Sequence, residues 1–153
     1  MSATLDTNVL IYAVDEDSDL QPRARALLGQ VATSPAITYL FWPVLMGYLR
    51  IITHPSILRS PLDPEAAIEG IDDLVRRPQI VVPGEGERFW SGFRSVASST
   101  PPRGVLVPDA HVVALMHEHG VGTIWSRDRD FRKFDGITVL DPFDERFSAG
   151  FQV

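Results

Sequence analysis

The sequence predicts an α/β fold of three layers, with a mainly parallel sheet of about five strands between two layers of helices. Three observations support this prediction. Short apolar segments alternate along the chain with longer segments that have the apolar periodicity of helices. Capping residues and prolines precede several of the helical segments. The length of 153 residues fits one domain, and 44% hydrophobic against 22% charged residues is a globular composition. We therefore treat residues 1–153 as a single domain.

The first third of the chain alternates in this way from its beginning. Residues 3–5 are expected to form a strand that ends at Asp6, a residue suited to cap the apolar helix that follows. After an acidic loop, Pro22 is placed to open a second helix. Residues 36–40 suggest a second strand, and a helix starting at Trp42 is expected to stop before a His-Pro pair.

The rest of the chain continues the pattern. Asp109 is expected to head a helix that Gly120 ends, and residues 126–130 are expected to form a loop. No clear element is predicted after Asp141. The other expected elements are a helix opened by Asp63 and Pro64, a helix over 87–98, and strands over 80–82, 121–125 and 137–140.

Three aspartates fall where such a fold binds ligands, beyond the carboxyl ends of parallel strands. Asp6 and Asp128 follow strands, and Asp109 begins a helix that can border the same crevice. Taken alone, each one is better explained as a helix cap or a polar turn residue than as a metal ligand. Two carboxylates about 5 Å apart repel by roughly 3 kcal/mol at an effective dielectric constant of about 20, so convergence of all three implies a cation.

Oxygen ligands favour Mg²⁺ or Mn²⁺, and such ions activate water for phosphodiester hydrolysis. The absence of cysteine excludes thiolate zinc and iron–sulfur sites. The net charge of -6 argues against nonspecific nucleic-acid binding, but bound cations reverse the local potential. Neither a signal peptide nor a membrane-spanning segment is evident, so we expect a cytoplasmic protein without a membrane partner.

Four motifs in order along the chain resemble those of PIN-domain ribonucleases, especially VapC-type toxins of bacterial toxin–antitoxin pairs. They are Leu5–Ala13, Leu49–Pro55, Pro108–His111 and Ser126–Phe131. The resemblance covers nearly the whole chain and implies a PIN-like fold, endonucleolytic cleavage of RNA, a VapB-type antitoxin and a homodimer.

The resemblance also implies roles for individual residues. Asp6, Asp109 and Asp128 would hold Mg²⁺ or Mn²⁺, and Asp130 would be an auxiliary ligand or position a water. Asn8 and Ser126 match polar positions beside the acids and would orient ligands or water. These are the supporting groups that we expect.

One position departs from the family pattern. Gly47 stands where the family usually supplies a further acid, commonly glutamate, so a second metal is not assured. Arg50, three residues later, would lie on the same side of the helix and could hold a carboxylate or a phosphate, or simply be solvated.

Two alternatives to a nuclease stay open. The first is an attenuated PIN domain that binds RNA or an antitoxin without cutting. The second is an aspartate-based phosphatase of the haloacid-dehalogenase type, although that chemistry needs a second aspartate where this chain has Asn8.

Other polar and aromatic residues are assigned no firm role. His111 could touch a substrate, whereas His117 and His119 are expected at the surface. The three tryptophans could stack on bases, but packing is the expected role. Basic residues that could receive RNA phosphates are Arg103, Arg127, Arg129, Arg132 and Lys133.

Overall fold

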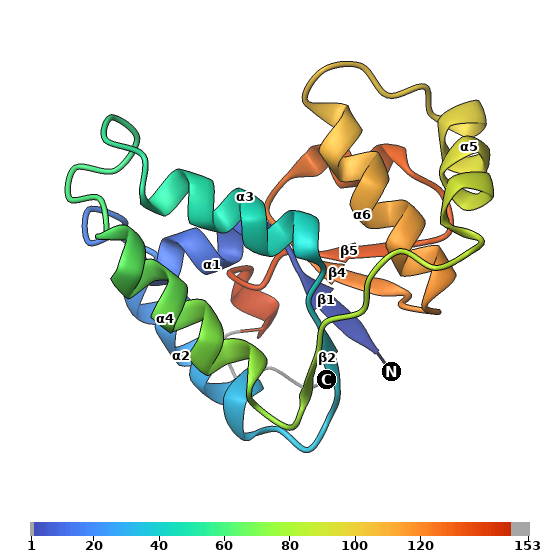
Figure 1. Cartoon of the computed structure of the whole chain (residues 1–153). Coiled ribbons are helices and arrows are strands. Elements are labelled where there is room, and N and C mark those ends of the chain that lie inside the picture. Colours follow the sequence, from blue (N-terminus) through green and yellow to red (C-terminus); the bar gives the residue numbers. More distant parts are fainter. Residues whose placement is uncertain (1, 148–153) are drawn as a thin grey trace.

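A five-stranded parallel sheet forms the centre of the computed structural model, which describes residues 2–147 (Figure 1). The spatial order of the strands is β3-β2-β1-β4-β5, and every neighbouring pair is parallel. The strands are β1 (Ala3–Leu5), β2 (Thr38–Tyr39), β3 (Ile80–Val81), β4 (Thr123–Trp125) and β5 (Thr138–Leu140). The predicted α/β class and the number of strands are confirmed.

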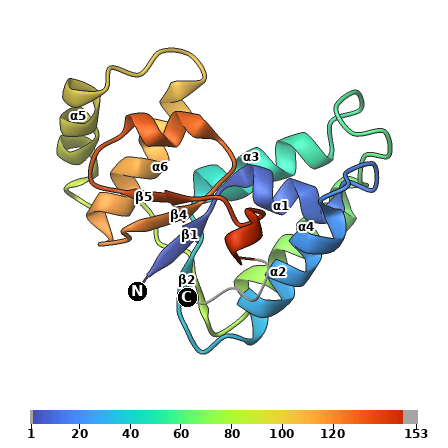
Figure 2. The same ribbon diagram turned by 180° about the vertical axis from the view of Figure 1, so that it is seen from behind.

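Helices cover both faces of the sheet. Figures 1 and 2 show α1, α2 and α4 together on one side of the molecule, with α5 and α6 on the other. The helices are α1 (Thr7–Val14), α2 (Gln21–Thr33), α3 (Trp42–Ile52), α4 (Pro64–Val75), α5 (Phe89–Ser99) and α6 (Leu106–Glu118), with short 3-10 helices η1 (Arg129–Lys133) and η2 (Glu145–Phe147). Helix α3 packs on α1 and α4 and also touches α6, so it joins the two sides.

The helix caps and the terminating glycine that the sequence predicted are present in the structure. Asp6 caps α1, and the Asp63 side chain accepts hydrogen bonds from the first free backbone N–H groups of α4. The chain leaves α6 through Gly120 at a φ of 67°, a conformation that favours glycine. Buried strand and helix residues such as Leu5 and Leu115 form the central core.

The start of α6 differs from the prediction. The helix begins at Leu106, so Asp109 lies in its first turn and does not head it. A turn supplies the start: the Leu106 and Val107 N–H groups donate to the carbonyls of Arg103 and Gly104. Pro108 is tolerated because the first N–H groups of a helix lack helical partners in any case.

The first and last residues of several helices and strands also differ from the predicted ones. The second strand is confined to Thr38–Tyr39 within the expected 36–40, and α5 starts at Phe89, two residues after the expected start. The segment after Asp141 contains η2, where no element was expected, and residues 148–153 lie outside the described part of the chain. Within residues 2–147, every helix is too short or too polar to cross a membrane.

The strand order places a crevice at one edge of the sheet. Strands β1 and β4 are neighbours, with Leu5 paired to Trp125, but the chain leaves β1 toward β2 and leaves β4 toward β5 in the opposite direction. Ligands of open α/β sheets bind at such a reversal, outside the carboxyl ends of the strands. Asp6 and Ser126 are the next residues after β1 and β4.

Candidate functional site

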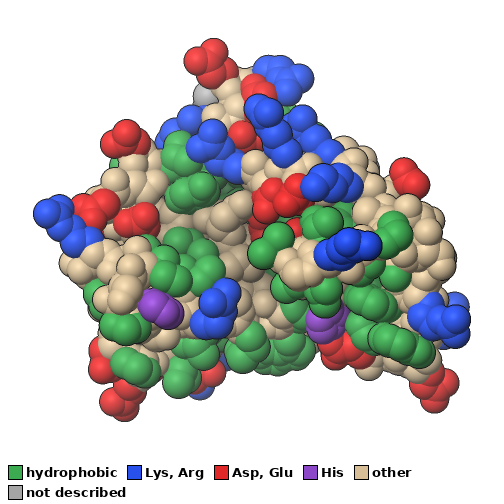
Figure 3. All heavy atoms as spheres, turned by 90° about the horizontal axis from the view of Figure 1, so that it is seen from above, with side chains coloured by type: hydrophobic (Ala, Val, Ile, Leu, Met, Phe, Trp, Pro, Cys, Tyr) green, Lys and Arg blue, Asp and Glu red, His purple; other side chains and the backbone are tan. Residues whose placement is uncertain are grey.

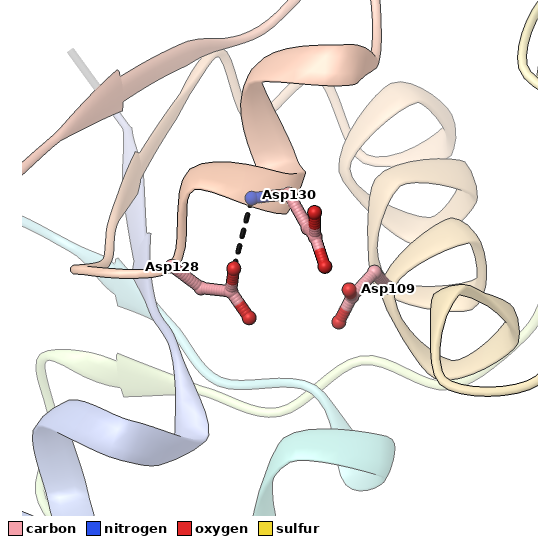
Figure 4. Close-up of side chains that lie close together, drawn as sticks. All are labelled: Asp109, Asp128 and Asp130. Atoms are coloured by element: carbon pink, nitrogen blue, oxygen red, sulfur yellow. Dashed lines mark hydrogen bonds between the residues drawn. The ribbon is translucent and has the colours of Figure 1, made fainter.

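Four aspartates come from three segments to this crevice. Asp6 follows β1, Asp128 and Asp130 lie after β4, and Asp109 lies in the first turn of α6. Carboxylate oxygens of Asp109, Asp128 and Asp130 all lie within 4.8 Å of one another. Figure 4 shows these three side chains pointing toward a common space between α6 and the turn after β4. The topology thus joins residues that are far apart in sequence.

Asp6 is held deeper than the other three. The residue is 8% exposed, and each of its carboxylate oxygens accepts a hydrogen bond. The Thr7 N–H donates to Oδ1 over 2.6 Å, and the Ser126 hydroxyl donates to Oδ2 over 2.5 Å. The Asp128 N–H donates in turn to Ser126 Oγ over 2.8 Å, and Asn8 Nδ2 lies 3.5 Å from the same oxygen. Ser126 therefore connects Asp6 with the turn that carries Asp128.

The turn after β4 fixes the other acids. The Asp130 N–H donates to Asp128 Oδ1 over 2.8 Å, which caps η1 (Figure 4). Lys133, one helical turn later, places Nζ 2.6 Å from Asp130 Oδ1. The Lys133 ammonium group thus offsets part of the negative charge of the acids. The sequence suggested Lys133 as part of a phosphate-binding rim, and the structure pairs it with an acid of the cluster.

Burial and neighbouring negative charges raise the pKa of two of these acids. Burial raises the pKa of Asp6 from 3.8 to about 6, against the hydrogen bonds from Ser126 and Thr7, and the charge of Asp128 adds to the rise. The pKa of Asp109 rises to about 7 through burial and then through the charges of Asp6, Asp128 and Asp130. A carboxyl group whose ionised form is this unfavourable gains most from a bound cation.

The donor set fits a hard divalent cation. Every candidate ligand is a carboxylate oxygen, the type that Mg²⁺ and Mn²⁺ prefer. Asn8 Oδ1 is also buried beside the acids and accepts no hydrogen bond from the described residues. It can accept from a water of a hydrated cation.

A cavity of about 700 Å³ opens from the acids between α3 and α6. Asp6, Asp109 and Asp128 line it together with Gly47 and Arg50 of α3. Figure 3 shows this face: acidic side chains border a hollow, Lys and Arg side chains gather around them, and hydrophobic side chains flank the hollow. The structure thus brings the three aspartates named from the sequence to one cavity, and places Asp130 against two of them.

Sequence reasoning missed one acidic lining residue. Glu85, in the loop between β3 and α5, also lines the cavity, and its Oε1 lies 2.6 Å from Nε2 of His111. Because Glu85 lies in a segment rich in glycine and charge, no periodicity marked it. Its contact with α6 depends on how that loop crosses the helix.

The family described as the PIN domain matches residues 3–137. Ribonuclease VapC48 of Mycobacterium tuberculosis is 50% identical over 94% of this chain and 99% of its own length. Ribonuclease VapC43 of the same species is 32% identical over 92% of this chain and 95% of its own.

The fold comparison agrees. The crystal structure of VapBC2 from Rickettsia felis, bound to a DNA fragment from the promoter, contains a chain that matches with a TM-score of 0.65 at 12% identity. The match covers 91% of this chain and 97% of that one. At this identity the likeness concerns the fold, which is the three-layer arrangement described above.

Proposed function

Because the chain belongs to the PIN-domain family and, within it, to the VapC ribonucleases, we propose that it hydrolyses RNA phosphodiester bonds internally with Mg²⁺ or Mn²⁺. One observation carries the metal-dependent part of this proposal. Carboxylate oxygens of Asp109, Asp128 and Asp130 come within 4.8 Å of one another, and such crowding is costly unless a cation lies among them.

Each acid has a part in this proposal. Asp6, Asp109 and Asp128 would hold the cation, and Asp130, paired with Lys133, would act as an auxiliary ligand or position water. A bound divalent cation supplies a more acidic water and offsets the charge that develops on the phosphate.

Two neutral groups orient the acids and the water. Ser126 donates to Asp6 Oδ2, a contact that favours the ionised form of that carboxylate and fixes its direction. Asn8 lies against Ser126 with its amide nitrogen and keeps its buried Oδ1 available to orient water. Arg50, at the other side of the cavity, is placed to contact a phosphate of the RNA.

We propose further that the protein is the toxin of a toxin–antitoxin pair. The solved structures that share its fold include toxin–antitoxin complexes, such as VapBC from Salmonella typhimurium and FitAcB from Neisseria gonorrhoeae. By analogy, a VapB-type antitoxin would silence the protein, a homodimer would be its resting form, and RNA in the cytoplasm would be its substrate. Family membership favours this function over an aspartate-based phosphatase.

A second candidate function rests on Gly47. This residue lines the cavity where the family usually has an acid, so α3 contributes no carboxylate. A PIN domain that binds RNA without cutting it is the function that such a loss would leave.

The deciding experiment measures cleavage of an RNA pool by metal-free protein to which Mn²⁺ is then added. We expect cleavage that requires the metal, that Asp6→Asn abolishes, and that the exposed control Asp19→Asn retains. Undiminished cleavage in excess EDTA would contradict the metal requirement. RNA binding without cleavage at saturating Mn²⁺ would establish the second candidate.

A further inference from the structure

The cavity is much larger than a cation needs. A cation with six waters occupies about 180 Å³, since each water takes about 30 Å³. The cavity holds about 700 Å³. Away from the acids it is lined mostly by apolar side chains of α3 and by the first turn of α6, including Trp42, Met46 and Val107. Most of this space therefore suits a flat apolar group.

Three large hydrophobic side chains stay exposed around this space. Trp42 is 43% exposed, Met46 47% and Val107 44%. Trp90 stacks on Phe93 at 5.5 Å between ring centroids, whereas the Trp42 ring contacts no other aromatic ring within residues 2–147. Its face is thus available to a planar ligand.

A polar pair lies at the edge of the same space. Glu85 and His111 both line the cavity and hold each other over 2.6 Å. The His111 ring also packs against Phe89 at 5.0 Å between centroids, which fixes its orientation. The Glu85 carboxylate can only accept hydrogen bonds, so it favours a ligand edge that presents N–H donors.

The Arg50 guanidinium lies on the same side of α3 as Trp42. Trp42, Met46 and Arg50 are spaced four residues apart on α3 and so lie along one side of the helix. Arg50 is exposed, lines the cavity and forms no ion pair with the acids of residues 2–147. It can bind a phosphate of a strand whose base lies on Trp42.

We propose that this space is a nucleobase subsite of the RNA strand, next to the acids. An unstacked base lies on the Trp42 ring, its edge faces the Glu85–His111 pair, and Arg50 contacts a neighbouring phosphate. Guanine fits best, since its Watson–Crick edge presents two adjacent N–H donors to a carboxylate, whereas uracil presents one between two carbonyls. This subsite rests on the proposed ribonuclease function and would supply part of its sequence preference.

The first test compares two exposed tryptophans in cleavage of a short single-stranded RNA. Trp42→Ala should raise KM about tenfold with little change in kcat, since one base stack is lost. Trp42→Phe should keep most of the affinity. Trp90→Ala removes an exposed indole that does not line the cavity, so it should change neither constant. Thermal melting of each variant checks the fold.

The second test compares two exposed glutamates with RNAs that differ at one nucleotide. Glu85→Gln replaces an acceptor-only group by one that also donates, so the preference for guanine over uracil should fall several-fold. Glu87→Gln, in the same loop but outside the cavity, should leave the preference unchanged. An equal preference before and after Glu85→Gln would overturn the role of this residue.

The outcomes separate this inference from the proposed function. If the wild-type protein cuts RNA and Trp42→Ala leaves KM unchanged, the subsite is wrong although the nuclease stands. If Trp42→Ala changes the mass measured by light scattering and leaves KM unchanged, the surface is a protein contact. That result would also overturn the subsite. If no RNA is cut, binding of RNA containing 2-aminopurine to Asp6→Asn protein decides: quenching that needs Trp42 supports the subsite, and its absence overturns it.

Discussion

The two halves of the acid cluster are built differently. Asp6 is buried, and both of its oxygens accept hydrogen bonds, one from the Thr7 backbone and one from Ser126. Asp109 is half-buried, and its carboxylate accepts no hydrogen bond from residues 2–147, while three other acids raise its pKa. Folding satisfies the hydrogen bonds of the first carboxylate, although burial still raises its pKa. The second is left with unfavourable charge.

A bound cation should act differently on these two carboxylates. The side chains around Asp6 are already held in place by hydrogen bonds at the ends of β1 and β4. A cation should therefore change their positions little. The Asp109 half is electrostatically strained, so cation binding should stabilise it most. Variants of the two halves should therefore differ in how they change stability with and without metal.

Asp109→Asn should change both cleavage and stability, and we expect the largest combined effect from it. Loss of a ligand should reduce RNA cleavage on the order of a thousandfold, beyond the 10- to 100-fold typical of groups that only orient ligands. The same change removes repulsion, so the variant should melt at a higher temperature than the wild type in EDTA. Cleavage assays and calorimetry of the same samples measure both. A lower melting temperature in EDTA would contradict the strained state of Asp109.

Ser126→Ala should have the next largest effect. It leaves Asp6 Oδ2 without its hydroxyl donor in a buried place, and it removes the acceptor of the Asp128 N–H. We expect a loss of about 1–3 kcal/mol in stability and a 10- to 100-fold loss of cleavage. Denaturant unfolding gives the first quantity. Ser126→Thr keeps the hydroxyl and should recover part of the activity; equal loss in both variants would argue against the hydrogen bond.

The sequence predicted the architecture because its signals are local. The caps at Asp6 and Asp63, the apolar periodicity and Gly120 each act within a few residues, and the structure places helices at them. The predicted start of α6 was wrong because a turn at Gly104 lets the helix begin three residues before Asp109. Pro108 lies inside this first turn, whereas the sequence suggested that the helix begins after it. The first strand has the predicted length, and the other four are shorter than predicted because pairing depends on the neighbouring strand.

The site was predictable only in part. Asp6, Asp109 and Asp128 could be named because the strand-end rule and the family motifs agree on them. The Lys133–Asp130 pair and the Glu85–His111 pair could not be named, since each depends on side-chain directions in loops. The apolar wall at Trp42 was also missed, because an exposed tryptophan looks the same in sequence as a packed one.

The pH dependence of stability tests the raised pKa values of Asp6 and Asp109 without mutation. The pKa of Asp6 is raised to about 6 and that of Asp109 to about 7, both from 3.8. The folded state therefore binds protons more tightly, so this part of the stability is complete below about pH 4 and is lost as the pH rises through about 6 and 7.

In metal-free buffer the melting temperature should fall across that window, by about 2–4 °C for each kcal/mol lost. Mg²⁺ should remove most of the fall, because the bound cation favours the ionised acids. Asp109→Asn should flatten the upper part of the curve. A melting temperature that rises from pH 4 to pH 7 in EDTA would contradict the raised pKa values.

The smallest expected effects concern Gly47, at the opposite wall of the cavity. A Cβ built there would lie 3.5 Å from Thr7 Oγ1 and 3.6 Å from its Cγ2, which is ordinary contact. Gly47→Ala should therefore stabilise the helix by about 0.5–1 kcal/mol and leave cleavage unchanged. Gly47→Glu adds a carboxylate at the same wall. It should lower the Mg²⁺ concentration for half-maximal cleavage several-fold, and lower the melting temperature in EDTA through added repulsion.

Comparing the two Gly47 variants isolates the charge, since the alanine variant alone reports the change of backbone and volume. If Gly47→Glu leaves the metal requirement unchanged, the acids at the ends of β1, β4 and in α6 already saturate the cation, and the glycine marks a site that works without an acid from α3. If the requirement falls, the wild-type cluster is short of charge on the α3 side. Either result tells whether the missing carboxylate on α3 limits metal binding.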